Sequence, residues 1–398
     1  MLPPLRHLLT ALLACLFLAS AVSAPAVAAP TQECTAKTSP PPPVDTSEQP
    51  QPGQPSPGPV PVPAEPIGGQ RLGGCGVITP AGAGAPDQVT AASWVIADLD
   101  SGAILGARDP HARQRPASLI KVLLSLVIMR EVDLTKDFVG TPEDAQQDGT
   151  LVGMGPGGQY QGGNVFKALL MASGNDAAHA LAVRAGGVPI TVQKMNEEAK
   201  RLGALDTQVA TPSGLDGPGM MTSAYDMALF YREAMKHKEF AEAVGTEQID
   251  FPGYAEHPAF KVNNDNRLLY TYDGFLGGKT GFTDDARHTY LGGAARAGHR
   301  LVSVLMRGEN LPVRMTDQAG HLLDWGFAQY QAKATPESVG TLVSQEAPHN
   351  AKLVAGDATA TLPAKKESGM LAGIAFVVAG VSFTLLLVWW MRQPRRRR

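Results

Sequence analysis

The chain has 398 residues, of which 44% are hydrophobic and 18% are charged, and its formal net charge is −3. This length allows two or three domains. The charge balance excludes a broadly basic surface for nucleic acid, because the only concentrated positive run is at the C-terminal end, at residues 395–398.

The N-terminus has the pattern of a secretory signal peptide. An apolar run at residues 8–22 follows Arg6, and Ala26-Val27-Ala28 has the small-x-small pattern that signal peptidase reads. We therefore predict a signal peptide at residues 1–28 and an exported chain. Cys15 lies inside an apolar run that continues past it, which disfavours lipidation of this cysteine.

A proline-rich stretch follows at residues 29–86. Its prolines recur from Pro40 to Pro66, which excludes the interior of a helix or sheet and predicts an extended extracytoplasmic spacer that provides reach rather than chemistry. Cys34 and Cys75 flank these prolines. In an oxidising exterior they either close the spacer into a disulfide-bonded loop or remain free or intermolecular thiols.

A folded domain of mixed α/β character is predicted at residues 87–332. Two short strand patterns, 93–97 and 103–107, surround the hairpin signal Asp100-Ser101-Gly102. Helical patterns follow, and strand patterns return at the end of the domain. This order predicts one antiparallel sheet, completed by the first hairpin and flanked by helices. The helical patterns are 119–130, 165–172, 176–185, 190–202, 223–238 and 312–330, and the late strand patterns are 279–282, 288–296 and 300–306.

Two segments with different roles follow the domain. A polar connector at residues 333–369 contains one short strand signal at 338–344. Residues 370–391 predict a transmembrane helix, because 371–391 carry no charge and match the thickness of a bilayer. Trp389 and Trp390 suit a membrane interface, and the basic tail at 392–398 is expected on the cytoplasmic side. The chain is thus predicted to cross a membrane once, with its folded domain outside and its C-terminus in the cytoplasm.

Ser118 and Lys121 lie three positions apart where the first predicted helix begins. Pro116 marks its entry, and residues at i and i+3 share one face of a helix. A desolvated lysine amine beside a serine can take the hydroxyl proton, so Ser118 is a candidate nucleophile and Lys121 a candidate base. A capping serine followed by a surface lysine is the alternative interpretation.

Two further motifs are candidate parts of the same site as this pair. Ser173-Gly174-Asn175 lies between two predicted helices and offers a hydroxyl and a carboxamide, although such triplets are usually ordinary turns. Lys279-Thr280-Gly281 heads a predicted strand and combines a cation and a hydroxyl with a glycine that leaves room for a ligand backbone. A protected edge strand is its alternative interpretation. A phosphate-binding loop is excluded here, because its first glycine would fall at Asp273 and no helix follows.

Taken in order, Ser118-x-x-Lys121, Ser173-x-Asn175 and Lys279-Thr280-Gly281 resemble the three motifs around the acyl-transfer cleft of penicillin-binding proteins and serine β-lactamases. Residues 169–178, 194–196, 204–216 and 277–283 look like low-molecular-mass serine D-Ala-D-Ala carboxypeptidases. The resemblance covers nearly the whole folded domain but not the proline-rich spacer. It implies that residues 87–332 are a catalytic domain with the β-lactamase/DD-peptidase-like fold, an antiparallel sheet flanked by helices with a helical subdomain. It also implies that the membrane is a bacterial cell membrane.

The resemblance implies three catalytic residues. Ser118 would attack the carbonyl between two D-alanines to form an acyl-enzyme, and Lys121 would receive its proton. Ser173 would relay a proton to the departing D-alanine. No metal and no cofactor are expected. The expected partners are peptidoglycan stem peptides ending in D-Ala-D-Ala, and β-lactam antibiotics that acylate the same serine.

The resemblance also implies a set of substrate-binding residues. Asn175 would position the substrate amide and the catalytic lysine. Lys279 and Thr280 would hold the terminal carboxylate, with Gly281 beside them. The backbone N–H of Phe282 would pair with that of the nucleophile to form the oxyanion hole.

Several other activities are alternatives to a D-Ala-D-Ala carboxypeptidase. An endopeptidase or transpeptidase on the same cleft differs only in its donor and acceptor, and the sequence does not separate these. A β-lactamase is disfavoured because Glu197, Glu198 and Glu233, between the second and third motifs, have helical contexts rather than that of a deacylating loop. An inactive wall-binding module has no reason to keep both nucleophile and base, and the absence of an H-E-x-x-H pattern disfavours a zinc peptidase. The scattered carboxylates Asp98, Asp216 and Asp226 are interpreted as caps and turns.

Overall fold

The computed structural model describes Cys34, residues 36–343 and Leu353–Val354. The predicted signal peptide at residues 1–28 and the predicted membrane helix at residues 370–391 lie outside this range. Within the described part of the chain, no helix has both the length and the apolar character needed to span a bilayer.

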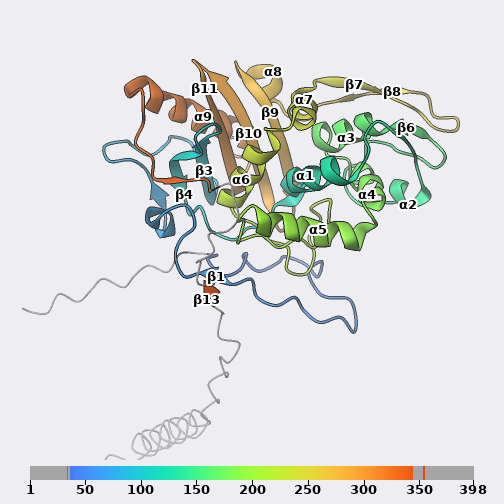
Figure 1. Ribbon diagram of the computed structural model, residues 1–398, viewed down its shortest axis with the longest axis horizontal. Coiled ribbons are helices and arrows are strands. Elements are labelled where there is room, and N and C mark those ends of the chain that lie inside the picture. Colours follow the sequence, from blue (N-terminus) through green and yellow to red (C-terminus); the bar gives the residue numbers. More distant parts are fainter. Residues whose placement is uncertain (1–33, 35, 344–352, 355–398) are drawn as a thin grey trace, which may run out of the picture.

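The centre of the domain is a seven-stranded antiparallel sheet (Figure 1). The predicted hairpin forms and pairs with a late strand, so the two ends of the domain complete one sheet, as predicted. The sheet also takes two short strands from outside residues 87–332, and one of them lies in the connector where a strand was predicted. In spatial order the strands are β12 (Gly340–Thr341), β4 (Ala103–Arg108), β3 (Ser93–Asp98), β11 (His299–Gly308), β10 (Arg287–Arg296) and β9 (Phe275–Thr283), and β2 (Val77–Ile78) pairs with β4.

Helices cover both faces of this sheet, which buries every residue of β3. Trp94 and Ile96 pack into a core shared with α9 (Met315–Ala332), while Val95 and Ala97 point into the larger core on the opposite face. Figure 1 shows α9 on one side of the sheet and the helices of the larger core on the other. The helices of the larger core include α1 (Lys121–Glu131), α3 (Gly162–Met171), α4 (Asn175–Arg184), α5 (Val188–Arg201) and α6 (Ala224–Ala234).

The predicted helices form with shifted ends. The pattern at 223–238 becomes α6 alone, which ends at Ala234, and His237 adopts an extended backbone before the next helix begins at Lys238. Several elements were not predicted, and all of them except one helix of eight residues have only three or four residues, too few to show a period. These are α2 (Pro142–Ala145), α7 (Lys238–Gly245), α8 (Leu268–Thr271), and the strand pairs β5 (Asp137–Val139) with β6 (Gln159–Gln161) and β7 (Gln248–Phe251) with β8 (Phe260–Asn263).

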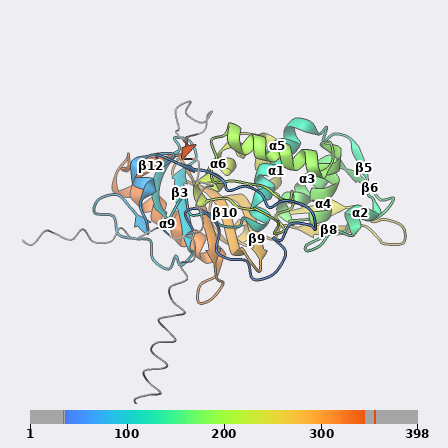
Figure 2. The same ribbon diagram turned by 90° about the horizontal axis from the view of Figure 1, so that it is seen from below.

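The proline-rich spacer differs from its expected role. Its residues 36–66, which we call the strap, lie along the catalytic domain, below α5 in Figure 1 and across the view in Figure 2. Arg113, with 0% exposure, donates to the carbonyl oxygens of Thr38, Val60 and Pro61 at 2.9, 2.6 and 2.8 Å. Prolines lack N–H donors but keep their carbonyls, so a five-donor guanidinium is a suitable partner for such a segment. The strap therefore packs as part of the domain.

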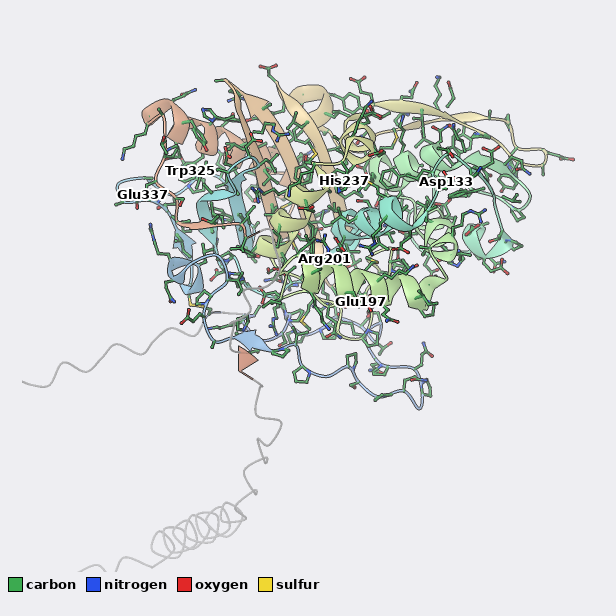
Figure 3. The ribbon with its side chains drawn as sticks, viewed as in Figure 1. Asp133, Glu197, Arg201, His237, Trp325 and Glu337 are labelled. Atoms are coloured by element: carbon green, nitrogen blue, oxygen red, sulfur yellow. A yellow bond between two sulfur atoms is a disulfide. The ribbon has the colours of Figure 1, made fainter. Side chains whose placement is uncertain are left out.

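A disulfide and a buried polar network fix the rest of the spacer. Cys34 and Cys75 are bonded, with 5.1 Å between their Cα atoms, so the spacer is a closed loop. Figure 3 labels Trp325, whose Nε1 donates to the carbonyl of Gly84 at 3.0 Å and holds the end of the spacer against α9. The shorter elements here are η1 (Gln70–Gly73) and β1 (Val62–Pro63), which pairs with β13 (Leu353–Val354).

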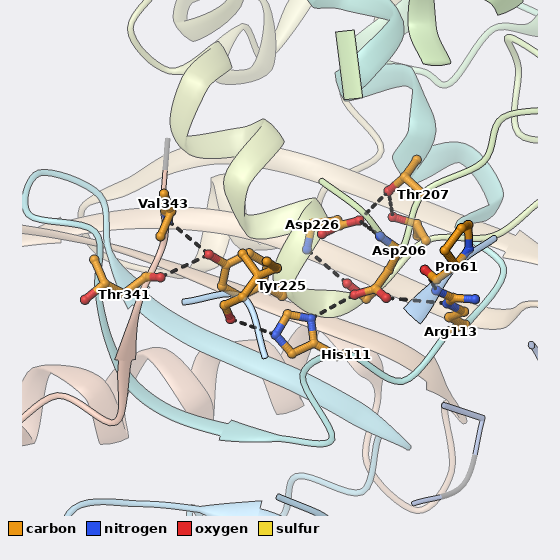
Figure 4. A network of polar contacts seen from close by, with 12 residues as sticks. Pro61, His111, Arg113, Asp206, Thr207, Tyr225, Asp226, Thr341 and Val343 are labelled. Atoms are coloured by element: carbon orange, nitrogen blue, oxygen red, sulfur yellow. Dashed lines mark hydrogen bonds and ion pairs between the residues drawn. The ribbon is translucent and has the colours of Figure 1, made fainter. Parts of the chain in front are cut away.

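The polar network lies where the spacer meets α6 (Figure 4). The two ring nitrogens of His111 contact Asp206 Oδ2 at 2.8 Å and the carbonyl of Ile67 at 3.0 Å. Burial alone would lower the pKa of His111, but the bond to Asp206 raises it above its ordinary value. Tyr225 donates its hydroxyl proton to the carbonyl of Thr341 at 3.0 Å. One buried network thus joins the spacer, the domain and the connector.

Candidate active site

Ser118 lies in the 3₁₀ turn η2 (Ala117–Ile120), which leads directly into α1. The expected first turn of an α-helix is therefore tighter, and Ala117 has a φ of 48°. A non-glycine residue in this region costs about 1–3 kcal/mol and persists only where packing holds it. Ala117 is fully buried, and a Cβ on Gly214 would lie 2.0 Å from its carbonyl oxygen. Close packing thus holds Ala117 in its strained conformation directly before Ser118.

Lys121 is fully buried and touches three oxygen atoms. Its Nζ lies 2.9 Å from Ser118 Oγ, 2.8 Å from Asn175 Oδ1 and 2.6 Å from the carbonyl of Ser213. The carboxamide oxygen of Asn175 and the backbone oxygen of Ser213 can only accept hydrogen bonds, whereas the serine hydroxyl can also donate one. A neutral lysine amine would donate to both acceptors and turn its lone pair toward the serine.

Electrostatics favour that neutral form. Burial, followed by the positive charge of Lys279, holds the pKa of Lys121 well below its ordinary value. The arrangement is therefore a partly exposed hydroxyl whose proton can pass to an uncharged amine.

The second motif forms the predicted turn between α3 and α4. Ser173 has a φ of 60° and 7% exposure, and Asn175 begins α4. The carboxamide of Asn175 is held at both ends, since its nitrogen donates to the carbonyl of Asp148 at 2.6 Å while its oxygen accepts from the lysine. These contacts fix which end of the amide faces the lysine.

Asp176, which the sequence reasoning overlooked, stabilises the loop beside this motif. Its buried carboxylate accepts the backbone N–H groups of Val152, Gly153 and Met154 at 3.0, 2.8 and 2.9 Å. These three bonds hold residues 152–154 against the first turn of α4. The sequence signal that could have identified Asp176 is its position in the first turn of α4, directly after Asn175.

The third motif lies in the middle of β9 rather than at its head, because the strand begins at Phe275. Lys279 is fully buried, and its Nζ donates to the carbonyl of Thr280 at 2.8 Å. Burial lowers the pKa of Lys279, and the charge of Asp265 opposes this shift. The hydroxyl of Thr280 donates to Asp265 Oδ2 at 2.9 Å, so this unpredicted carboxylate orients the motif.

Gly281 is the point where β9 meets the nucleophile turn. A Cβ at this position would lie 2.4 Å from Thr289 Oγ1 and 3.0 Å from the backbone nitrogen of Ser118. Thr289 in turn donates to the carbonyl of Pro116 at 2.9 Å. The ring of Phe282 is 48% exposed and contacts the His288 ring. The role expected of this residue, in the oxyanion hole, involves only its backbone N–H.

The structure thus joins most of the predicted site residues. Hydrogen bonds connect Ser118, Lys121 and Asn175, and the charge of Lys279 acts on Lys121. The carbonyl of Ser213 was not predicted as a contact, although it belongs to the 204–216 stretch that carries the family resemblance.

Comparison with known proteins agrees with this geometry. A family model described as D-alanyl-D-alanine carboxypeptidase matches residues 80–310. The carboxypeptidase DacB2 of Mycobacterium tuberculosis is 43% identical over 256 residues, which cover 63% of this chain and 87% of the relative. DacF of Bacillus subtilis is 33% identical, over 61% of this chain and 63% of the relative.

Solved structures give the same result. A D-alanyl-D-alanine carboxypeptidase from Mycobacterium tuberculosis H37Rv is 41% identical with a TM-score of 0.62, over 66% of this chain and 99% of the other. The Streptomyces K15 DD-transpeptidase has a TM-score of 0.58 at 21% identity, over 62% and 100%, which supports the fold alone. The predicted fold, an antiparallel sheet with flanking helices, is confirmed. The chain belongs to the family of serine-type D-Ala-D-Ala carboxypeptidases.

Proposed function

We propose that the chain is a membrane-anchored D,D-carboxypeptidase that removes the terminal D-alanine of peptidoglycan pentapeptides through an acyl-enzyme on Ser118. The contacts of Lys121 carry this proposal. A fully buried amine with two acceptor-only neighbours and one hydroxyl neighbour at 2.9 Å is arranged to take that hydroxyl's proton.

The reaction follows from these contacts in two steps. In acylation, the Ser118 proton passes to Lys121 as Oγ bonds to the scissile carbonyl carbon. The carbon–nitrogen bond then breaks, and the proton held by Lys121 passes by way of Ser173 to the departing D-alanine amine. In deacylation, water attacks the ester carbonyl carbon and gives a proton to the Lys121 amine. The lysine returns this proton to Oγ as the Oγ–carbon bond breaks, which restores the serine and releases the shortened peptide. β-Lactams would acylate the same Oγ.

The roles proposed for residues of β9 imply a direction for the bound substrate. Lys279 and Thr280 would hold the terminal carboxylate, and the N–H of Phe282 would bind the scissile carbonyl oxygen. The peptide would therefore run antiparallel to β9, with its acyl portion continuing past Thr283. In the described sheet β9 is an edge strand paired with β10, and an edge of this kind can accept an added strand.

Release of D-alanine from a pentapeptide ending in D-Ala-D-Ala tests the activity and its nucleophile together. Wild-type chain should release D-alanine, Ser118→Ala should release none above background, and Ser338→Ala, at an exposed position, should retain wild-type activity. Release by Ser118→Ala at the wild-type rate would contradict the assignment. Endopeptidase and transpeptidase activity remain the alternatives, and a cross-linked dimer or an added amine acceptor distinguishes them in the same assay.

The membrane anchor is proposed from the sequence. Deleting residues 371–398 should move the protein from the membrane fraction to the soluble extracytoplasmic fraction. Retention in the membrane would instead point to an uncleaved N-terminal segment or to lipidation at Cys15.

A further inference from the structure

Three carboxylates from distant parts of the sequence converge beside the strap. Glu48 belongs to the strap, Asp216 follows the loop that contacts the nucleophile turn, and Asp285 lies between β9 and β10. One carboxylate oxygen from each lies within 4.8 Å of the others. Like charges at such separations repel one another unless a proton or a cation lies among them.

Two of these carboxylates have unmatched oxygens. Asp285 is 2% exposed, and its Oδ1 accepts from the backbone N–H of Val44 while its Oδ2 has no hydrogen-bond partner. Asp216 Oδ1 is likewise buried without a partner. Buried polar atoms are nearly always paired, so two unmatched acceptors in one cluster indicate a missing positively charged or proton-donating group.

The neighbouring guanidinium groups make no hydrogen bond to either of these two oxygens, although the charge of Arg115 acts on Asp216 and Asp285 as well as on Glu48. Arg115 makes a two-pronged pair with Glu48, with 2.8 Å between Nη2 and Oε2. Arg307 donates to the backbone carbonyl of Asp285 at 2.8 Å rather than to its carboxylate.

We propose that Glu48, Asp216 and Asp285 bind a divalent cation of the calcium type. Oxygens this close together can all lie roughly 2.5 Å from one central point, which is the usual calcium–oxygen distance. A purely carboxylate donor set suits a hard cation, whereas zinc prefers nitrogen and sulfur ligands. Each carboxylate oxygen has two lone pairs, so Glu48 can bind the ion without releasing Arg115.

The ion would fasten the strap to the catalytic cleft. Arg115 lies three residues before Ser118, and Asp285 lies two residues after the end of β9. Arg115, which pairs with Glu48, and the ligand Asp285 thus connect the strap to both sides of the nucleophile. Calcium would add to the contacts through which Arg113 and the disulfide already hold the strap, so its removal would loosen the strap around Glu48 first.

Calorimetric titration of the full-length chain with calcium chloride tests this proposal, after chelation and dialysis. We expect saturable binding with a dissociation constant of about 10⁻⁴–10⁻³ M, the range of extracellular calcium modules. Glu48→Gln and Asp285→Asn should each weaken binding at least roughly tenfold. Glu65→Gln, which removes the same charge from an exposed position in the strap, should bind like wild type.

A second measurement on the wild type avoids any variant that fails to fold. Calcium should slow proteolytic cleavage within residues 36–66, and sodium chloride at equal ionic strength should not. Absence of saturable binding up to about 10 mM calcium, or unchanged affinity in both ligand variants, would overturn the proposal. None of these readouts depends on peptidase activity, so their failure would leave the proposed function untouched.

Discussion

Replacing Gly281 by alanine should impair acylation far more than it impairs folding. The added Cβ would lie 2.4 Å from Thr289 Oγ1, about 1 Å inside ordinary contact, and 3.0 Å from the backbone nitrogen of Ser118. The first clash pushes β9 outward, and the second acts on an N–H expected to bind the oxyanion. A displacement of about 1 Å typically costs a hundredfold in rate, or about 2.7 kcal/mol of transition-state stabilisation. Overpacking typically costs about 1–3 kcal/mol of folding stability.

The second-order rate of acylation by a fluorescent penicillin measures this effect, and thermal unfolding measures the cost in stability. Gly84→Ala is the matched control, because a Cβ there meets nothing within 4 Å. It should acylate at the wild-type rate. A folded Gly281→Ala enzyme that acylates as fast as Gly84→Ala would refute the inference that β9 and the nucleophile turn are too close together to admit a side chain at residue 281.

Three further predictions concern charge and stability. The low pKa of Lys121 means that the acylation rate should rise with pH through that pKa and level off well below pH 10.5; a pH–rate profile that climbs to pH 10.5 would show a charged lysine at neutral pH. Arg113→Ala leaves three strap carbonyls without their donor and should cost about 3 kcal/mol or more in urea unfolding. Arg71→Ala, at a side chain 45% exposed, should cost about 1 kcal/mol or less, and equal losses would contradict the buried role. Cys34 and Cys75 are 41 residues apart in sequence, so replacing both by serine opens the loop between them and should lower the free energy of unfolding by about 4 kcal/mol. An unchanged midpoint of urea unfolding would mean that the strap unfolds independently.

The core of the fold was predictable because its elements are long and periodic. The hairpin around Asp100-Ser101-Gly102 and the strands β10 and β11 carry enough β-branched and apolar residues to identify the sheet. The motif at Ser118 was predicted as part of a helix, but a tight turn forms instead. Contacts with Gly214 and Gly281, distant in sequence, hold that turn, and local spacing cannot reveal them.

The strap was missed for a related reason. A proline-rich composition predicts the absence of helix and sheet, which says nothing about where the segment lies. Its position depends on the buried side chain of Arg113, which donates hydrogen bonds to carbonyl oxygens from both ends of the strap. Asp216 was likewise interpreted as a turn residue, because its neighbours Glu48 and Asp285 are far away in the sequence.

The central claim is that Ser118 is the nucleophile that becomes acylated, and mass spectrometry of the penicillin-treated full-length chain tests it most directly. The wild type should gain the mass of one penicillin on the peptide that contains Ser118. Ser118→Ala should gain nothing while unfolding at the wild-type temperature. An adduct on another residue, or the same adduct on Ser118→Ala, would contradict the account.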